Sequence, residues 1–399
     1  MTGTEPSPGP RAKPTLAVLV AISTIQPIAL NLLAPATPGM ARQFGESYAT
    51  IQLTLTLFLV AVALTQLVVG PLSDRYGRRP CVNAGIALFV AGSVLGALAP
   101  STGVLLLARV LEGAGAGAAF ALSRAIIRDS ASRDQAASQI ASVTMVMVVA
   151  PMLAPWLGGQ IEAFAGWRMI FWFMAGVGSL VLTMTVLRLP ETAPNIGVET
   201  SFLGIFRAFP MLIADRGFVV NVVVLAMTSG SFFAFVAAAP FIVVEAMGRA
   251  PEVYGAWFIL NALGYMIGNF MMSRLAVRVG TARMVRIGLM ISFLAMSVGL
   301  ALALGPSWSP LTLFVPLAVN AMGNGLTIPG ATAEALSARP ELAGSAAGLM
   351  GAIHLGAGAL ATILIGALVT LWPPSLIAMT WAMMAAGLFS LRFNRIVSN

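Results

Sequence analysis

The stretch Gly70-Pro71-Leu72-Ser73-Asp74-Arg75-Tyr76-Gly77-Arg78-Arg79 separates two long apolar runs. It holds one acidic and three basic residues in a connection that is too short to be a domain. We interpret it as a short charged turn bounded by glycines, between two neighbouring helices. An ordinary solvated turn would account for the arginines but not for Asp74 or the glycines, so we expect a function for this turn.

The composition indicates that most of the chain is surrounded by lipid. Hydrophobic residues make up 58% and charged residues 9% of the 399 positions, whereas soluble domains carry about 25% charged residues. The net charge of +8 does not indicate nucleic-acid binding, because the cations lie scattered at the ends of apolar runs. Cys81 is the one cysteine, so an intrachain disulfide or a cysteine metal cluster cannot form.

Apolar runs of about 20 residues, the length of a membrane-spanning helix, predict twelve spans. They are 15–36, 49–72, 81–99, 103–127, 139–162, 168–188, 217–243, 252–275, 284–304, 310–331, 343–369 and 374–392. The predicted fold is an all-α integral membrane protein. Its domains are a disordered cytoplasmic tail (1–14), a six-helix bundle (15–188), a cytoplasmic linker (189–216), a second six-helix bundle (217–392) and a cytoplasmic tail (393–399).

The basic residues predict the orientation of these spans. With both termini in the cytoplasm, nearly all loop cations lie on the cytoplasmic side and only Arg42, Arg168 and Arg249 on the other. This is the distribution that the positive-inside rule describes. No small-residue cleavage site follows a short apolar stretch near the N-terminus, so we expect the first run to be retained as a span rather than cleaved.

An internal repeat supports two similar halves. Ser273 to Gly280 aligns with Gly70 to Gly77 at an offset of 203 residues, and Val277 stands where the first copy has Asp74. Two parallel halves with a cavity between them at mid-membrane are typical of secondary transporters.

Three stretches resemble motifs of the major facilitator superfamily. Residues 70–79 are similar to its G-x-L-x-D-R-x-G-R-[RK] loop between the second and third helices, and Arg109 to Gly117 to its R-x-x-x-G-x-G signature. Ala150 to Gly159 resembles the antiporter signature in the A-P-x-x-A-P-x-x-G-G form of the Bcr/CflA drug-resistance group. The resemblance extends over the whole chain. It implies two six-helix bundles around a central cavity, in the inner membrane of a bacterium.

The resemblance implies a conformational latch at the charged turn. In the family the equivalent of Asp74 bonds to an arginine at the end of the fourth helix, which here is Arg124 or Arg128, with Asp129 as a second acid. The latch residues expected on this basis are Gly70, Asp74, Arg75, Gly77, Arg78, Arg79, Arg124, Arg128 and Asp129. The alternative is a static surface ion pair, which contributes little.

The fourth predicted helix carries two charges inside the membrane, Arg109 and Glu112. Such residues are costly in lipid and therefore indicate a functional site. Their spacing of three places them on one face, where they can pair. Asn31 stands where the Bcr/CflA group has a proton-binding aspartate, and an amide cannot take over that role. We therefore expect Glu112, with Arg109, to carry the proton and His354 to be the reserve carrier; the alternative is a permanent structural pair.

The fifth predicted helix carries the antiporter motif residues Pro151, Pro155, Gly158 and Gly159. Its prolines bend the helix, and the glycine pair permits close contact with a helix of the other half. An ordinary proline-kinked packing helix is the alternative. Polar and aromatic side chains in other spans are expected to line the substrate cavity, or else to bond helix to helix. They are Asn31, Gln26, Phe58, Phe232, Phe235, Trp257, Tyr265, Asn320 and Asn324.

The sequence favours a proton-driven antiporter that exports amphipathic drugs. No Walker loop or common hydrolase motif is present, so we expect no enzyme, no ATP drive, no metal and no cofactor beyond the proton gradient. The expected partners are protons, a drug-like small molecule and the lipid bilayer, with no nucleic acid, and the chain is expected to be a monomer. Two alternatives are an uptake symporter for a polar metabolite and a membrane receptor that transports nothing.

Overall fold

The computed structural model describes residues 14–130, 153–193, 209–305, 308–339 and 342–398. Every regular element within these ranges is a helix. The elements are α1 (Leu16–Leu32), η1 (Ala34–Ala36), α2 (Thr37–Phe44), α3 (Tyr48–Tyr76), α4 (Arg78–Ala97), α5 (Thr102–Ser130), a helix over 153–165, α7 (Trp167–Arg188), α9 (Phe209–Ala214), α10 (Arg216–Phe241), η2 (Ile242–Ala246), α11 (Pro251–Val279), α12 (Thr281–Ala303), α13 (Pro310–Ala338), α14 (Ala343–Leu368) and α15 (Ser375–Ser398).

The predicted all-α membrane fold is confirmed. Among the described residues, ten helices are long and apolar enough to cross a membrane. The 29-residue α11 and the helix over 153–165 occupy two further predicted spans. The start of the predicted span 139–162 lies outside the described residues up to position 152.

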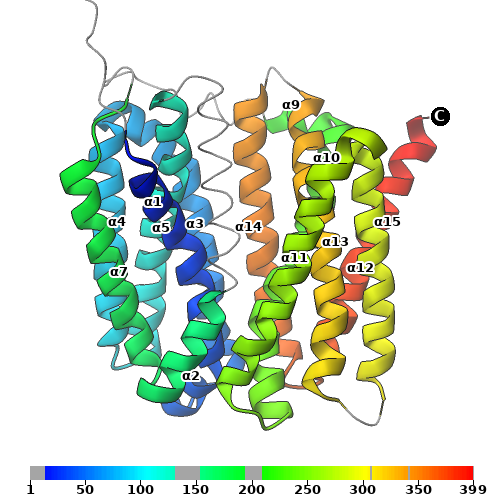
Figure 1. The fold of residues 1–399 in the computed structure, drawn as a ribbon, viewed down its shortest axis with the longest axis horizontal. Coiled ribbons are helices and arrows are strands. Elements are labelled where there is room, and N and C mark those ends of the chain that lie inside the picture. Colours follow the sequence, from blue (N-terminus) through cyan, green and yellow to red (C-terminus); the bar gives the residue numbers. More distant parts are fainter. Residues whose placement is uncertain (1–13, 131–152, 194–208, 306–307, 340–341, 399) are drawn as a thin grey trace, which may run out of the picture.

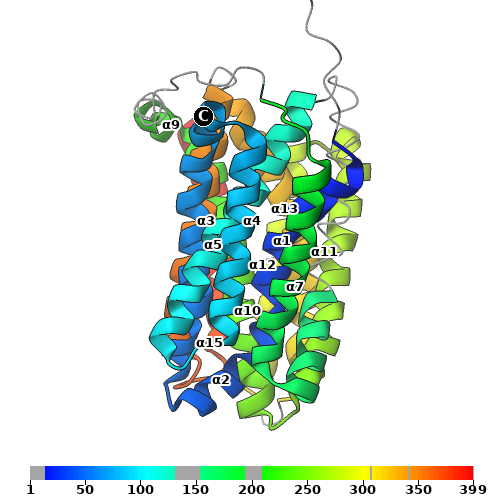
Figure 2. The ribbon, with the colours of Figure 1, turned by 90° about the vertical axis from the view of Figure 1, so that its left-hand side faces the viewer.

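The helices are arranged as two groups that lie side by side. Figure 1 shows α1 to α7 on the left, called here the N-terminal half, and α10 to α15 on the right, the C-terminal half. Figure 2 views the molecule from the N-terminal half, whose helices run lengthwise from α2 at one end to the opposite end. We call these ends the α2 end and, because Gly77 lies there between α3 and α4, the Gly77 end.

The charged stretch that was predicted as a turn is instead almost entirely helical. α3 continues through Gly70 and Asp74 to Tyr76, and α4 begins at Arg78. Gly77 alone reverses the chain, with a φ of 99° that side-chain-bearing residues rarely adopt. At about 1.5 Å per residue, a helix of 29 residues spans the head-group layers as well as the hydrocarbon core. The charges can therefore remain helical where the apolar run has already ended.

The backbone carries the internal repeat. Gly77 and Gly280 have φ angles of 99° and 91°, and Gly45 and Gly248 have φ angles of 65° and 62°. The members of both pairs are 203 residues apart, as are Arg42 and Glu245, which form an ion pair. The same sharp turns thus recur at equivalent places in the two halves.

The halves contact each other towards the α2 end. α3 packs along α14, and η1 and α2 lie against α10. We call this contact the seam and define it by Arg42, Tyr48, Gln52, Thr56 and Gly159 of the N-terminal half and Ala237, Glu245, Gly255, Thr362 and Gly366 of the C-terminal half.

Candidate functional site

The two charges of α5 form an ion pair in the interior of the N-terminal half. Nη1 of Arg109 donates to Oε2 of Glu112 at 2.6 Å, and the side chains are 1% and 0% exposed. Ser93 of α4 donates its hydroxyl to Oε1 of Glu112, also at 2.6 Å. Both carboxylate oxygens therefore have partners, and Glu112 lies on the side of α5 that faces α4.

Arg109 extends from this pair towards the neighbouring helices. Its guanidinium donates to the carbonyl oxygens of Thr54 in α3 and Ala29 in α1, both at 3.3 Å. The ring of Phe58 lies 4.3 Å from the guanidinium carbon, within the range of a cation–π contact. Groups from three helices, including the Glu112 carboxylate, thus hold the cation in a fixed position. Their hydrogen bonds offset the desolvation free energy of the buried charge.

Glycines bring these helices close enough to form the site. A Cβ at Gly113 would lie 2.5 Å from the carbonyl oxygen of Phe58, and one at Gly92 would lie 2.8 Å from the nitrogen of Glu112. Both distances are shorter than real Cβ contacts. The R-x-x-x-G spacing therefore places the arginine one turn before the point where α5 and α3 touch.

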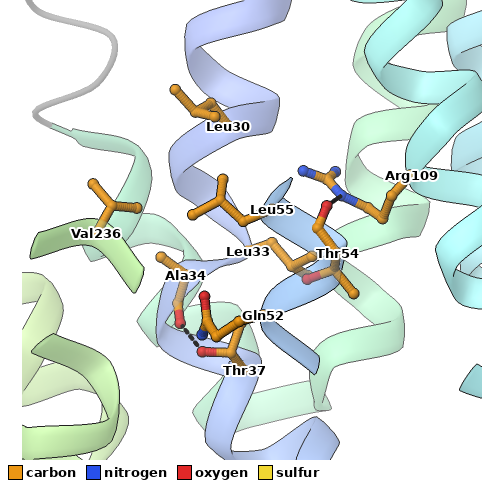
Figure 3. Close-up of a pocket in the computed structure, with 9 residues that line it drawn as sticks. All are labelled: Leu30, Leu33, Ala34, Thr37, Gln52, Thr54, Leu55, Arg109 and Val236. Atoms are coloured by element: carbon orange, nitrogen blue, oxygen red, sulfur yellow. Dashed lines mark hydrogen bonds between the residues drawn. The ribbon is translucent and has the colours of Figure 1, made fainter. Parts of the chain in front are cut away.

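A small cavity lies beside Arg109, at the seam. Figure 3 shows the residues that line it: Leu30, Leu33, Ala34, Thr37, Gln52, Thr54, Leu55, Arg109 and Val236. It has room for about one water molecule, far less than drug-sized sites need. Among the described residues that line it, none is acidic. Arg109 therefore faces the cavity, while its carboxylate partner points towards α4.

None of the nine residues predicted for the substrate cavity lines this space. Phe58 lies against the Arg109 guanidinium. Asn31 donates to the carbonyl oxygen of Pro27 at 2.9 Å, in its own helix. Gln26 accepts from Gln66 at 3.4 Å. In this structure these side chains therefore make contacts within the N-terminal half, and their predicted role in the substrate cavity stays a prediction.

The predicted aromatic residues of the C-terminal half pack mainly on other aromatic rings of the same half. Phe235 stacks on Phe258 with ring centres 5.4 Å apart, and Trp257 stacks on Phe314 at 6.0 Å. Phe232 meets Phe233 edge to face at 5.4 Å. Large rings gain most from mutual contact, which explains why they form an aromatic core here. The remaining one, Tyr265, accepts through its backbone oxygen from Asn269 at 2.9 Å.

The remaining predicted polar groups lie between helices of the C-terminal half. Nδ2 of Asn324 reaches the hydroxyl of Ser231 at 3.5 Å, and the backbone oxygen of Asn320 accepts from Ser292 at 3.1 Å. His354 shares a 2.6 Å hydrogen bond between its Nδ1 and the Ser229 hydroxyl. His354 thus contacts α10, whereas Arg109 and Glu112 lie in the other half.

At the Gly77 end, Asp74 pairs with Arg78 rather than with a cation of α5. The Asp74 carboxylate lies 2.7 Å from Nη2 of Arg78, and the same guanidinium donates to Asp129 at 2.9 Å. The expectation for Arg124 is wrong, because its guanidinium lies over the ring of Phe120, 4.6 Å from the ring centre. The side chain of Arg128 lies outside the described residues. Arg78 therefore connects α3, α4 and α5 within one half.

The other basic residues of the stretch lie around this connection. Arg75 lies over the ring of the adjacent Tyr76 at 5.4 Å. Arg79 donates to the carbonyl oxygen of Val186 in α7 at 2.7 Å. The carbonyl oxygen of Gly70 accepts from the Ser73 hydroxyl at 2.7 Å.

Sequence reasoning missed Glu191, which caps the first turn of α4 from the chain that follows α7. Its carboxylate accepts from the backbone nitrogens of Arg78 at 2.9 Å and Arg79 at 3.1 Å. Burial alone would raise the pKa of Glu191, but hydrogen bonds from four backbone N–H groups lower it below its usual range. A Cβ at Gly77 would meet this carboxylate at 2.5 Å, a second reason for glycine there.

Among the described residues, three polar side-chain contacts join the halves at the seam towards the α2 end. Arg42 forms an ion pair with Glu245. The Tyr48 hydroxyl donates to the carbonyl oxygen of Ala237 at 2.6 Å, and the hydroxyls of Thr56 and Thr362 lie 2.6 Å apart. The spacing of four between Tyr48, Gln52 and Thr56 places them on one face of α3, a polar stripe that the sequence already displays.

The two glycines of the antiporter motif have different neighbours. A Cβ at Gly158 would overlap the carbonyl oxygen of Leu32, in the same half. A Cβ at Gly159 would lie 3.1 Å from Cα of Glu252, at the start of α11. The expectation that both contact the other half therefore applies to Gly159 and is wrong for Gly158. Pro155 also lies at the seam, beneath Gly255, and Pro151 is outside the described residues.

A bundle of two repeated halves, with an intramembrane ion pair beside a cavity at their contact, defines a secondary membrane transporter. The chain belongs to the Major Facilitator Superfamily, whose sequence profile matches residues 19–362.

Curated relatives cover most of the chain. It is 30% identical over 356 residues to the uncharacterized MFS-type transporter YdgK of Bacillus subtilis strain 168, with 86% of each chain covered. It is 29% identical to the bicyclomycin resistance protein homolog of Haemophilus influenzae, with 85% of each covered. It is 27% identical to multidrug resistance protein D of Escherichia coli K12, with 87% of each covered. The resemblance to Bcr/CflA-like exporters is thereby confirmed, and these relatives are described as transporters or resistance proteins.

The fold matches a solved transporter as well. The nucleoside transporter NupG superposes with a TM-score of 0.76, covering 94% of this chain and 98% of that one at 12% identity. At that identity the likeness concerns the fold alone.

Proposed function

We propose that this protein is a proton-coupled antiporter that exports amphipathic small molecules from the bacterial cytoplasm by alternating access. The observation that carries the proposal is the Arg109–Glu112 pair, buried in the membrane beside a cavity at the seam. Relatives named for bicyclomycin and multidrug resistance support export rather than uptake.

The contacts at the seam favour an inward-facing state. The positive-inside rule assigns the Gly77 end, with Arg75, Arg78 and Arg79, to the cytoplasm. The α2 end then faces outwards, where Arg42–Glu245 and Tyr48–Ala237 join the halves. In the outward-facing state these contacts must break. Asp74 and Arg78 act in this cycle by holding α3, α4 and α5 together as one body that moves as a unit.

Glu112 is the proposed proton carrier. While Glu112 is ionised, the pair with Arg109 is close to neutral and the cavity can receive a neutral or cationic molecule. Protonation leaves the Arg109 cation uncompensated beside the cavity, which disfavours a cation there. Because Arg109 lies between the cavity and Glu112, substrate and proton compete through the same guanidinium. A permanent structural pair would give no such competition.

Glu112→Gln tests this proposal. Purified protein in proteoliposomes is assayed for proton release on drug addition and for export against a gradient, with a drug chosen by a resistance panel in a pump-deficient host. We expect both to be lost, while Glu46→Gln, at an exposed carboxylate, retains both. A Glu112→Gln variant that still releases protons and exports against a gradient would show that Glu112 is not the carrier.

Ser93→Ala is the gentler variant, because it removes one hydrogen bond to Glu112 and leaves both charges in place. A hydrogen bond to a charged group contributes about 1.5–3 kcal/mol. Its loss destabilises the ionised form of Glu112 relative to the protonated form. We expect the pH profile of export to move to higher pH. An unchanged profile in a well-folded Ser93→Ala protein would favour the structural pair.

A further inference from the structure

Gln52 is a buried amide whose hydrogen-bonding capacity is unused. It lies in the second turn of α3 and is 1% exposed. Neither Oε1 nor Nε2 has a hydrogen-bond partner within the described part of the chain. Leaving a buried polar group unpaired costs about 1–3 kcal/mol. Buried polar groups are nearly always paired, so an exception of this kind indicates a function or an absent partner.

The neighbours of Gln52 are already committed to other bonds. The Tyr48 hydroxyl donates its proton to the carbonyl oxygen of Ala237, so towards the nearby Gln52 amide it can act only as an acceptor for one N–H. The hydroxyl of Thr37 donates to the carbonyl oxygen of Ala34 at 2.8 Å. Arg109, across the cavity, is held by Glu112. Gln52 is thus the polar side chain of the lining that retains both a donor and an acceptor for a molecule in the cavity.

The backbone of the other half holds Gln52 in this position. A Cβ at Gly366 of α14 would lie 3.1 Å from Cβ and 3.2 Å from Cγ of Gln52. The aliphatic part of the side chain is therefore packed against α14 at the seam, and Figure 3 shows the amide among the residues around the cavity. Movement of α14 away from α3 would release the side chain, which couples the state of this amide to the opening of the seam.

We propose that Gln52 contacts the transported molecule and selects for an uncharged group that both donates and accepts hydrogen bonds. This rests on the export function proposed above and names the class of substrate. An amide offers a donor NH₂ group and an acceptor oxygen side by side. A cation would find no carboxylate among the described lining residues, since Glu112 is turned towards Ser93. The Gln52 amide therefore recognises neutral polar groups, whereas the entry of a cation into the cavity depends on the Arg109–Glu112 pair.

Two probes separate these chemistries. Chloramphenicol is uncharged and carries an amide and two hydroxyls, whereas tetraphenylphosphonium is a cation without hydrogen-bonding groups. Uptake of each into everted membrane vesicles gives KM and kcat for the wild type, for Gln52→Leu and for Gln66→Leu. Gln66 is the matched control, a glutamine on the same helix that bonds to Gln26 away from the cavity.

We expect Gln52→Leu to raise the KM for chloramphenicol about tenfold, the effect of losing two neutral hydrogen bonds, and to leave the KM for tetraphenylphosphonium unchanged. Gln66→Leu should change neither. Gln52→Leu should also raise the melting temperature of the substrate-free protein in detergent, because it removes two unpaired buried atoms. A structural glutamine would give the opposite shift in melting temperature.

Equal KM values for chloramphenicol in the wild type and in Gln52→Leu would overturn the assignment of Gln52 while leaving export intact. A wild-type protein that moves neither probe would refute the export function for these compounds, and the assignment with it. An equal loss of transport of both probes in Gln52→Leu would also overturn the assignment of Gln52. The residue would then act on the conformational cycle instead of on neutral substrates.

Discussion

Gly255 is the position where a single methyl group should shift the balance between the two states. It lies in α11 at the seam, where a Cβ would be 2.6 Å from the carbonyl oxygen of Pro155 and 2.7 Å from Cα of Trp156. Ordinary Cβ contacts begin at 3.4 Å, so the shortfall is about 0.8 Å. Both opposing atoms belong to backbone, and neither can rotate away. Gly255→Ala should therefore separate the halves at the α2 end.

The cost can be estimated from overpacking of a well-filled interior, which is about 1–3 kcal/mol per added group. At about 2 kcal/mol, the equilibrium between the closed and open α2 end shifts roughly thirtyfold towards open. The closed state bears the whole penalty, because the open state no longer holds the two backbones together. Membrane insertion and helix content should stay unchanged.

Distances between spin labels measure this shift directly. The labels are placed at Glu46→Cys and Arg249→Cys, two exposed positions at the α2 end, in a background with Cys81→Ser. Gly255→Ala should move population from the short to the long distance. The control is Gly176→Ala on α7, where a Cβ meets nothing within 4 Å. Matching distance distributions in wild type, control and Gly255→Ala would refute the assignment of this contact to the moving seam.

Two other contacts give further predictions. Arg42→Ala and Glu245→Ala should each shift the equilibrium towards the open α2 end by only about 0.2–1 kcal/mol, since both side chains are partly exposed. The charge-swapped double variant Arg42→Glu, Glu245→Arg should restore the closed end in the same spin-label assay. If the swapped variant stays open, a charge effect is excluded. Glu191→Gln should lower thermal stability at pH 7 by about 1–2 kcal/mol, because the amide loses acceptor capacity at the α4 N-terminus. Its folded-state pKa is lowered, so the stabilisation exists above the usual carboxyl pKa and disappears as pH falls through the lowered value. The difference between wild type and Glu191→Gln in melting temperature should therefore shrink in acid, and a constant difference would exclude the charge as its cause.

The sequence predicted the parts of this protein that depend on local pattern. Apolar run length located the spans, and the spacing of three between Arg109 and Glu112 predicted their contact, which the structure forms at 2.6 Å. The structure of the charged stretch was harder to predict, because hydropathy indicates where the hydrocarbon layer ends and not where the helix ends. α3 continues past that boundary until Gly77, and Arg78 then contacts Asp74 and Asp129 together.

The cavity could not be predicted in the same way. In a membrane, a helix face that meets lipid and one that meets another helix are both apolar, so the pattern does not reveal which face turns to the seam. Phe235 and Trp257 were assigned to the cavity for their chemistry, yet they pack in an aromatic cluster. Gln52 was overlooked although its spacing from Tyr48 and Thr56 marks one face of α3. The identity of the opposing helix, α14, depends on tertiary packing alone.

The divergence of the two repeats has a physical reason at the seam. Residues at equivalent positions of two halves can touch only near the axis that relates those halves, and Arg42 and Glu245 do so. Identical charges there would repel, so a charged pair can close this end only if one copy carries a cation and the other an anion. The repeats also differ at the Gly77 end, where Asp74 is paired with Arg78 within the N-terminal half and its equivalent Val277 is 93% exposed. Alternating access requires each end to close in turn through contacts that can break. Partly exposed pairs meet that need because each contributes about 1 kcal/mol or less, whereas in the cycle proposed above a proton separates the charges of the buried Arg109–Glu112 pair.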